Sequence, residues 1–164
     1  MNSLFANMYA ALETRITTNI PEIKGVFPEL QQLDNYKGQP DVWPCVFIDF
    51  TTFEFENLAQ REQTASGILS CKLAFSVTKS GSTDFIDKQT ALDYYEIETK
   101  LHQLLQGWSN GSCAPLVRTK IETADRKDTF RVRSLSYSLT FEESVATLPG
   151  STTSRPAADF LFRA

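Results

Sequence analysis

The sequence predicts an α+β domain built from two helices and a sheet of about four or five strands, with a projecting β-ribbon and a flexible C-terminal tail. Three observations predict it. Apolar residues recur every three or four positions in two segments, they alternate or run together in several others, and proline, glycine and charged residues separate these segments. Since 164 residues are the length of one domain, we expect a single domain over residues 1–143 and a tail over 144–164.

The chain begins with a predicted helix over about residues 4–19. Ser3 can cap its start, and Pro21 must stop it, because proline cannot continue a helix. The next stretch, 21–44, contains four prolines and no useful periodicity, so we expect a long connection with a short strand near residues 26–27. The apolar stripe of this helix is formed by Leu4, Phe5, Met8, Leu12 and Ile16.

Two strands are predicted next. Residues 45–50 form a nearly continuous apolar run, which is typical of a central strand covered on both faces. Residues 69–77 alternate between apolar and polar, which is typical of a strand with one face in water. Phe53 and Phe55 also alternate with polar residues, but residues 57–66 have no apolar periodicity, and we expect them to form a long solvated loop.

A second helix is predicted over about residues 88–106. Asp84 or Asp87 can cap it, and Gly107 can end it. Its apolar stripe is formed by Tyr94, Ile97, Leu101, Leu104, Leu105 and Trp108. Two extended segments then follow a loop and read as a hairpin, residues 116–124 and 130–141.

The register of this hairpin can be predicted from its side chains. Pairing Ala124 with Thr129 puts Ile121 opposite Val132, so that apolar residues meet across the strands. The apolar residues beyond Arg133 lie on the opposite parity, and we expect a β-bulge there. The base of the hairpin would then join the sheet while its tip, residues 118–133, projects.

Composition and motifs exclude several classes of function. A net charge of −4 disfavours sequence-independent binding to nucleic acid, and no segment is apolar enough for a membrane helix. The three cysteines have no metal-ligand spacing, which favours a reducing compartment. His102 is the only histidine, and no glycine-rich phosphate motif occurs. We therefore predict no catalytic residue, no metal site and no cofactor.

One enzymatic alternative remains open. Carboxylates cluster at Asp49, Glu54, Glu56 and Glu62, and acidic residues on strands can hold Mg²⁺. A metal-dependent nuclease could use Asp49, Glu54 and Glu122. The simpler interpretation is that Glu54 and Glu56 form the solvated side of a strand.

Charge is unevenly distributed along the chain. Residues 118–133 carry six basic and three acidic residues, a local charge of +3, whereas residues 49–62 carry four acidic residues and one arginine, a local charge of −3. These segments are either two solvated hairpins or complementary surfaces on neighbouring copies, which could close into a ring. The candidate interface residues are Arg118, Lys120, Arg126, Lys127, Phe130, Arg131, Val132, Arg133, Glu54, Glu56 and Glu62. In the tail, Phe160, Leu161 and Phe162 could dock on an axial partner.

The order of these elements resembles the tail terminator and tail-completion (neck) proteins of tailed bacteriophages. The resemblance covers the pattern of residues 1–143 and is carried by the strand Trp43-Pro44-Cys45-Val46-Phe47-Ile48, the strand over 68–78, the second helix, and the last strand, which ends Tyr137-Ser138-Leu139-Thr140-Phe141-Glu142. It rests on the order of the helices and strands and on the pattern of apolar residues in the strands, and it contains no diagnostic motif.

The resemblance implies a mixed or antiparallel sheet with both helices on one face. It implies a structural virion protein, made in the bacterial host cytoplasm, that forms a hexameric ring, stops growth of the tail tube and meets the head connector. The partners would be further copies of itself, the tail tube protein and head-connector or neck proteins. DNA would at most pass through the lumen without sequence-specific binding, and no active site is implied.

Overall fold

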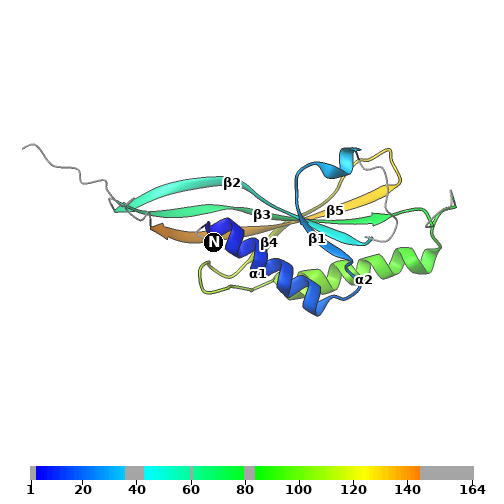
Figure 1. Ribbon diagram of the computed structural model, residues 1–164, viewed down its shortest axis with the longest axis horizontal. Helices are drawn as coiled ribbons and strands as arrows, with labels where there is room; N and C mark the ends of the chain where they lie inside the picture. Colours follow the sequence, from blue (N-terminus) through cyan, green and yellow to red (C-terminus); the bar gives the residue numbers. More distant parts are fainter. Residues whose placement is uncertain (1–2, 36–42, 60, 80–83, 145–164) are drawn as a thin grey trace, which may run out of the picture.

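The computed structural model describes residues 3–35, 43–59, 61–79 and 84–144, which form a five-stranded sheet with two α-helices on one face (Figure 1). The predicted α+β class is confirmed. The elements are α1 (Leu4–Asn19), β1 (Gly25–Pro28), the 3₁₀ helix η1 (Gln32–Asn35), β2 (Cys45–Ala59), β3 (Glu62–Ser76), α2 (Lys88–Leu105), β4 (Val117–Thr123) and β5 (Phe130–Ser144).

The sheet is mixed and has the strand order β1-β2-β3-β5-β4. Only β1 and β2 are parallel, and the other neighbours pair in antiparallel fashion. As predicted, the apolar start of β2 lies inside the sheet, between β1 and β3, and Cys45–Ile48 is buried. The strands β2, β3 and β5 are each 15 residues long, so they extend beyond the helices (Figure 1).

Both helices begin and end close to the predicted positions. The Ser3 hydroxyl accepts a hydrogen bond from the backbone N–H of Ala6, and the Asp87 carboxylate accepts one from that of Thr90, so each side chain caps a helix start. Gly107, at a φ of 74°, follows the end of α2 in a conformation that favours glycine. Among the described helices, neither is long and apolar enough to span a bilayer.

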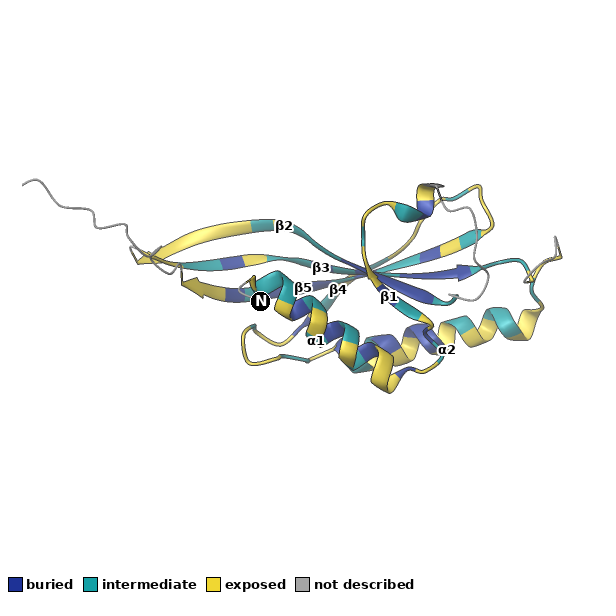
Figure 2. Cartoon of the chain, viewed as in Figure 1, coloured by how far each residue is buried: buried dark blue, intermediate teal, exposed yellow. Residues whose placement is uncertain are grey.

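The main hydrophobic core lies between the helices and the sheet (Figure 2). Each helix contributes a stripe of buried residues, and β3 and β5 contribute alternate residues from the facing side. The helical residues are Met8, Leu12, Ile16, Ile97, Leu101 and Leu105, and the strand residues include Leu69, Leu73, Leu135, Tyr137 and Leu139.

The opposite face of the sheet has a smaller core at the end where β5 begins. Val132 packs there with Leu33 of η1 and Phe47 of β2. This second core explains the change of parity along β5. The pairing of β3 with β5 is continuous, so the bulge predicted near Arg133 is wrong. Val132 and Leu135 face opposite sides of one regular strand, and both sides are covered.

The predicted hairpin register is also wrong, by three residues. Ile121 pairs with Leu135 instead of Val132, and the register shift lies in β4, between Arg118 and Lys120. An odd shift exchanges the two faces of a strand. Ile121 packs against the main core on the helix side, so its partner must be a β5 residue that faces the helices, and Val132 faces away from them.

The loop predicted over residues 57–66 is instead the turn end of a β-hairpin. The strand β2 continues to Ala59, β3 begins at Glu62, and the two pair almost to the turn. Ala65 is buried in the main core, but residues 57–59, 61 and 62 are exposed, so burial imposes no apolar alternation toward the turn, and backbone hydrogen bonds define the strands there. The strand β5 extends to Ser144, and residues 145–164, including the predicted docking residues Phe160, Leu161 and Phe162, lie outside the described residues.

Candidate interaction surfaces

A projecting ribbon is present, but it is formed by the β2–β3 hairpin and the end of β5. We call it the acidic arm and define it as residues 54–59, 61–66 and 142–144. It extends past the start of α1 and is mostly exposed (Figure 2). Five glutamates and one arginine give it a charge of −4. The carboxylates are those of Glu54, Glu56, Glu62, Glu142 and Glu143.

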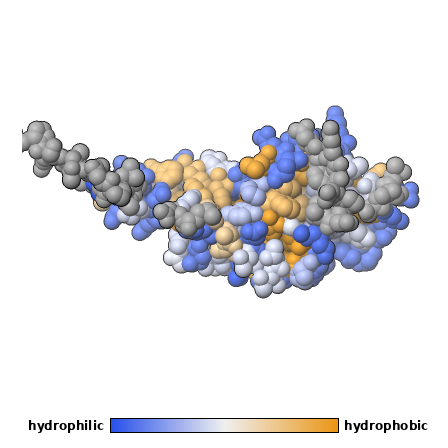
Figure 3. Space-filling model, viewed as in Figure 1, coloured by the Kyte–Doolittle hydropathy of each residue, from blue (hydrophilic) through white to orange (hydrophobic). Residues whose placement is uncertain are grey.

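The strand register sorts the side chains of the acidic arm onto two faces. Glu56 pairs with Thr64, and Thr64 pairs with Glu142, so two carboxylates flank a hydroxyl on one face. Phe55 pairs with Ala65 on the other face and is 49% exposed. Leu58, near the turn, is 57% exposed. The arm thus offers both negative charge and apolar surface, and apolar surface along β2 and β3 is visible in Figure 3.

An aromatic cluster fixes the base of the arm to the body. The ring of Phe5, from α1, lies 5.1 Å from the rings of both Phe50 and Phe53, and 5.6 Å from that of Phe141. Phe53 lies directly over Gly67, where a Cβ atom would come within 2.5 Å of the ring. The close approach of this ring requires glycine, and the arm therefore leaves the body in a defined direction.

Part of the basic segment 118–133 folds back on its own body. The Arg126 guanidinium donates to the Leu33 carbonyl and pairs with Asp34 and Asp128, which raises the pKa of Arg126 and lowers that of Asp128. These contacts hold the β4–β5 loop against η1. Arg126 is therefore used within the chain, and the expectation that the tip of this hairpin projects freely is wrong.

Arg133 is used in the same way. Its Nε and Nη2 atoms donate to the two Glu98 carboxylate oxygens at 2.6 and 2.9 Å, and its Nη1 donates to the Thr123 hydroxyl at 2.8 Å. The carboxylate of α2 is almost buried, so this bidentate pair joins the helix to the edge of the sheet. Val132 is buried as well, and Phe130 packs on Trp43 with ring centroids 4.6 Å apart.

Four other basic candidates lie nearer the surface. Lys120, Lys127 and Arg131 are exposed, although Lys120 pairs with the neighbouring Glu122 at 2.6 Å. Arg118 is half-buried, and its charge adds to the effect of burial in lowering the pKa of His102. The remaining acidic candidates, Glu54, Glu56 and Glu62, are all exposed in the acidic arm at the other end of the sheet. The predicted opposite charges are therefore placed on different parts of the surface.

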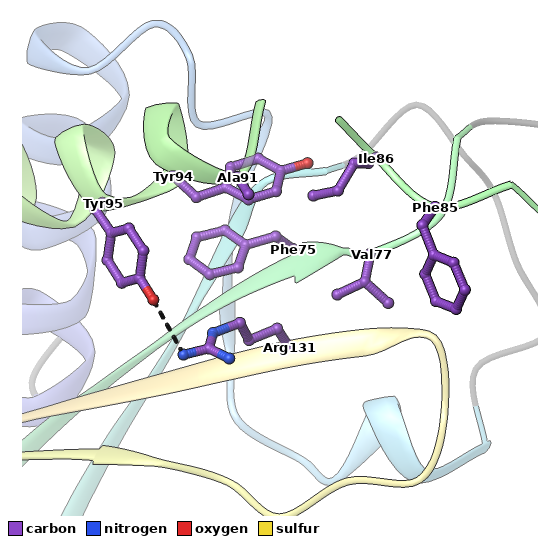
Figure 4. Close-up of a pocket in the computed structure, with 8 residues that line it drawn as sticks. All are labelled: Phe75, Val77, Phe85, Ile86, Ala91, Tyr94, Tyr95 and Arg131. Carbon is purple, nitrogen blue, oxygen red and sulfur yellow. Dashed lines mark hydrogen bonds between the residues drawn. The ribbon is translucent and has the colours of Figure 1, made fainter. Parts of the chain in front are cut away.

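A groove lies at the end of the molecule opposite the acidic arm, and its volume is about 260 Å³ (Figure 4). Phe75 and Tyr94 stack on one another with ring centroids 4.3 Å apart. Phe85, Ile86 and Tyr95 extend the apolar lining, and Arg131 stands at the edge, donating to the Tyr95 hydroxyl at 3.3 Å. We call these six residues the aromatic groove. Phe85 is 77% exposed and Tyr95 47% exposed.

Sequence reasoning did not find the aromatic groove. Tyr95 lies off the apolar stripe of α2, and Phe85 precedes the helix in a turn-rich stretch, so neither belongs to a periodic pattern. The available signal was that large apolar residues occur where no core position is predicted. The pairing of Thr78 with Phe85, together with the backbone hydrogen bond from Ile86 to Val77, brings this stretch beside the end of β3.

The carboxylates proposed for a nuclease are not brought together. Asp49 and Glu54 belong to β2, and Glu122 belongs to β4, so two strands separate them. Three strand spacings correspond to about 14 Å, too far for one metal ion. Within the described ranges, no group of three histidine, cysteine or acidic residues could hold a metal ion. Burial raises the pKa of the Cys45 and Cys71 thiols to about 12, which makes them unreactive.

Comparisons with known proteins bear on the fold. No family model matches the sequence, and no curated protein matches it. Among solved structures, the chain is similar to a chain in the virion of a native gene transfer agent particle, with a TM-score of 0.55 and 10% sequence identity, covering 87% of this chain and 100% of that one. A second solved chain is 12% identical, with a TM-score of 0.44 and coverages of 88% and 96%. The first likeness shows that this fold occurs over the whole length of a virion chain.

Proposed function

We propose that this chain is a non-enzymatic structural protein of a phage virion, which forms a ring at the tail or neck, ends the tail tube and joins it to the head connector. The observation that carries this proposal is the fold shared with a virion chain over 87% of the sequence. The element order described above, which resembles that of tail terminators, supports the more specific role and a ring of six copies.

The distribution of charge supports assembly from identical copies. The acidic arm lies at one end of the long axis, and the β4–β5 loop with the start of β5, which carry Lys127 and Arg131, lies toward the other (Figure 1). Opposite charges at opposite ends favour head-to-tail contact, which closes into a ring when the rotation between copies allows it. The lateral contact would pair Glu54, Glu56 and Glu62 of one copy with Arg118, Lys120, Lys127 and Arg131 of the next. In this proposal Arg126, Val132 and Arg133 make no contact with the next copy, because they contact other residues of their own chain and hold the basic segment in place.

The proposed axial partner is the tube or connector, and the proposed contact is the C-terminal segment. Deleting residues 145–164 is expected to leave assembly of the copies intact and to weaken binding to that partner. A pull-down with the tube or connector protein measures this binding. Loss of the ring itself on deletion would contradict the division into lateral and axial contacts.

Light scattering coupled to size-exclusion chromatography tests the ring. We expect the wild type to have the mass of about six copies of the 18.5-kDa chain. Replacing Glu54 and Glu56 by lysine should give monomers, because like charges then face Arg131 and Lys127. The matched control replaces Asp93 and Glu96 by lysine, an equal change of charge at two exposed positions of α2, and it should assemble normally. A monomeric wild type, or assembly that survives the arm substitutions, would contradict the proposal.

A further inference from the structure

Large apolar side chains remain exposed at both ends of the molecule. At the arm these are Phe55 and Leu58, and at the other end they are Phe85 and Tyr95. Isolated exposed apolar residues are ordinary, but apolar residues gathered around a groove mark a binding surface. Within the part of the chain that the structure describes, both sets are left exposed.

We propose that the aromatic groove is the docking site for the acidic arm of a second copy, with Phe55 and Leu58 packed against Phe85 and Tyr95. This inference rests on the proposed self-association and names the surfaces that carry it. Within one copy the arm and the groove lie at opposite ends of the long axis and cannot meet (Figure 1). The contact is therefore between copies. A linear assembly that has not closed into a ring has an unoccupied arm at one end and an unoccupied groove at the other.

Charge favours an acidic occupant for this groove. Arg131 is exposed at its edge, and the Tyr95 hydroxyl accepts a hydrogen bond from its guanidinium. In the arm, Glu54 and Glu56 flank Phe55 directly along the strand. Their side chains point to the opposite face from Phe55, because successive residues of a strand alternate between faces. Glu143 pairs with Gln63, which pairs with Asn57, so Glu143 shares the face of Phe55 and brings a carboxylate to the edge of the groove. The arm thus matches both the apolar lining and the positive edge.

The size of the contact explains why closure into a ring matters. An aromatic side chain can bury about 200 Å², so the exposed parts of Phe55, Phe85 and Tyr95 amount to roughly 350 Å². Stable interfaces bury about 1,600 Å² in total. One docked arm therefore holds two copies weakly, and a closed ring, in which each copy is held twice, is much more stable than an open pair.

Mixing two complementary variants tests the docking. Leu58→Glu removes the arm surface, and Phe85→Glu removes the groove surface. Each variant alone should be monomeric by light scattering. An equal mixture should contain a complex of two chains and nothing larger, because an intact arm of one variant meets an intact groove of the other and the opposite ends cannot bind. Leu30→Glu is the control, since Leu30 is also 77% exposed but lies outside both surfaces, and it should assemble like the wild type.

Circular dichroism confirms that each variant is folded before mixing. Because a single docked arm binds weakly, the mixture is measured at concentrations far above those at which the wild type assembles. Normal assembly of either variant, or a mixture that stays monomeric at those high concentrations, overturns the docking and leaves the proposed ring in place. A wild type that is monomeric under the same conditions contradicts the ring and the docking together.

Discussion

The two halves of the β2–β3 hairpin are both paired in antiparallel fashion but have opposite surroundings, and the two register shifts lie in the half toward the turn. In the half near the helices, Leu73 and Cys71 are fully buried, whereas in the acidic arm Phe55 and Leu58 are half exposed. Burial against the helices determines the first half, whereas backbone hydrogen bonds and a few exposed side-chain contacts, such as that from Gln63 to Asn57, hold most of the second. The difference indicates that the arm contributes little to the stability of the monomer and that its apolar side chains are available to a partner.

Truncating one leucine in each half tests whether the two halves contribute differently to the stability of the monomer. Leu73→Ala should lower the free energy of unfolding by about 2–5 kcal/mol, because it leaves a cavity in the main core. Leu58→Ala should change it by less than about 0.5 kcal/mol in the monomer, because this side chain is already in water. Urea denaturation at a concentration where the protein is monomeric measures both. A similar loss in the two variants would mean that the arm is part of the folding core.

A second prediction contrasts two basic residues on the neighbouring strands β4 and β5, Lys120 and Arg133. Arg133→Ala should cost about 1.5–3 kcal/mol, because Glu98 loses both guanidinium hydrogen bonds while remaining almost buried. Lys120→Ala should cost at most about 1 kcal/mol, since its pair with Glu122 is exposed.

Chemical denaturation of these variants also separates charge from geometry. Arg133→Lys keeps the charge and loses the bidentate contact, so its stability should lie between those of the wild type and Arg133→Ala. If Arg133→Ala is as stable as Lys120→Ala, then Arg133 does not join α2 to the sheet.

The smallest expected effect concerns pH and the Arg126–Asp128 contact. The pKa of Asp128 is lowered below its ordinary value of 3.8, chiefly by the hydrogen bond from Arg126. Its stabilising contribution is therefore complete above pH 3.8 and is lost as the pH falls below that value. Asp128→Asn should be less stable than the wild type at pH 7 by about 0.5–1 kcal/mol, a small amount because the carboxylate is partly in water.

Thermal unfolding at pH 7 and at successively lower pH measures this difference. The difference in stability between the wild type and Asp128→Asn should narrow as the pH falls, whereas the loss caused by Leu73→Ala, which removes no titratable group, should not narrow in this way. If the difference in stability between the wild type and Asp128→Asn is the same at every pH, the substitution acts through packing and not through the charge of Asp128.

The sequence predicted the helices and strands that bury one side against the core. It did not predict the parts of β2 and β3 near the turn, which are largely exposed. Both helices, the start of β2 and the end of β5 have a periodicity imposed by the core, and the structure places them within a few residues of the prediction. The distal halves of β2 and β3 have no such pattern, so residues 57–66 read as a loop. The hairpin register was wrong because Ile121 can pair plausibly with Val132 or Leu135, and only the position of the helices decides between them.

The candidate site shows the same division. The acidic surface was found because charge is readable from composition, and Glu54, Glu56 and Glu62 are exposed as a surface requires. The basic surface was found only in part, because Arg126 and Arg133 have partners far along the chain, in Asp34 and Glu98, which local sequence does not reveal. The aromatic groove depends on three separate segments meeting, and no single segment predicts it.

The central claim is that the arm of one copy reaches the groove of the next, and disulfide trapping tests it most directly. Leu58→Cys and Phe85→Cys, each made with Cys113→Ser, leave one accessible thiol per chain because Cys45 and Cys71 are buried. Since a disulfide forms only when the two Cα atoms approach within about 7 Å, mild oxidation of an equal mixture should give a dimer containing one of each variant. Cross-linked pairs of like variants, or none that join position 58 to position 85, would contradict the claim.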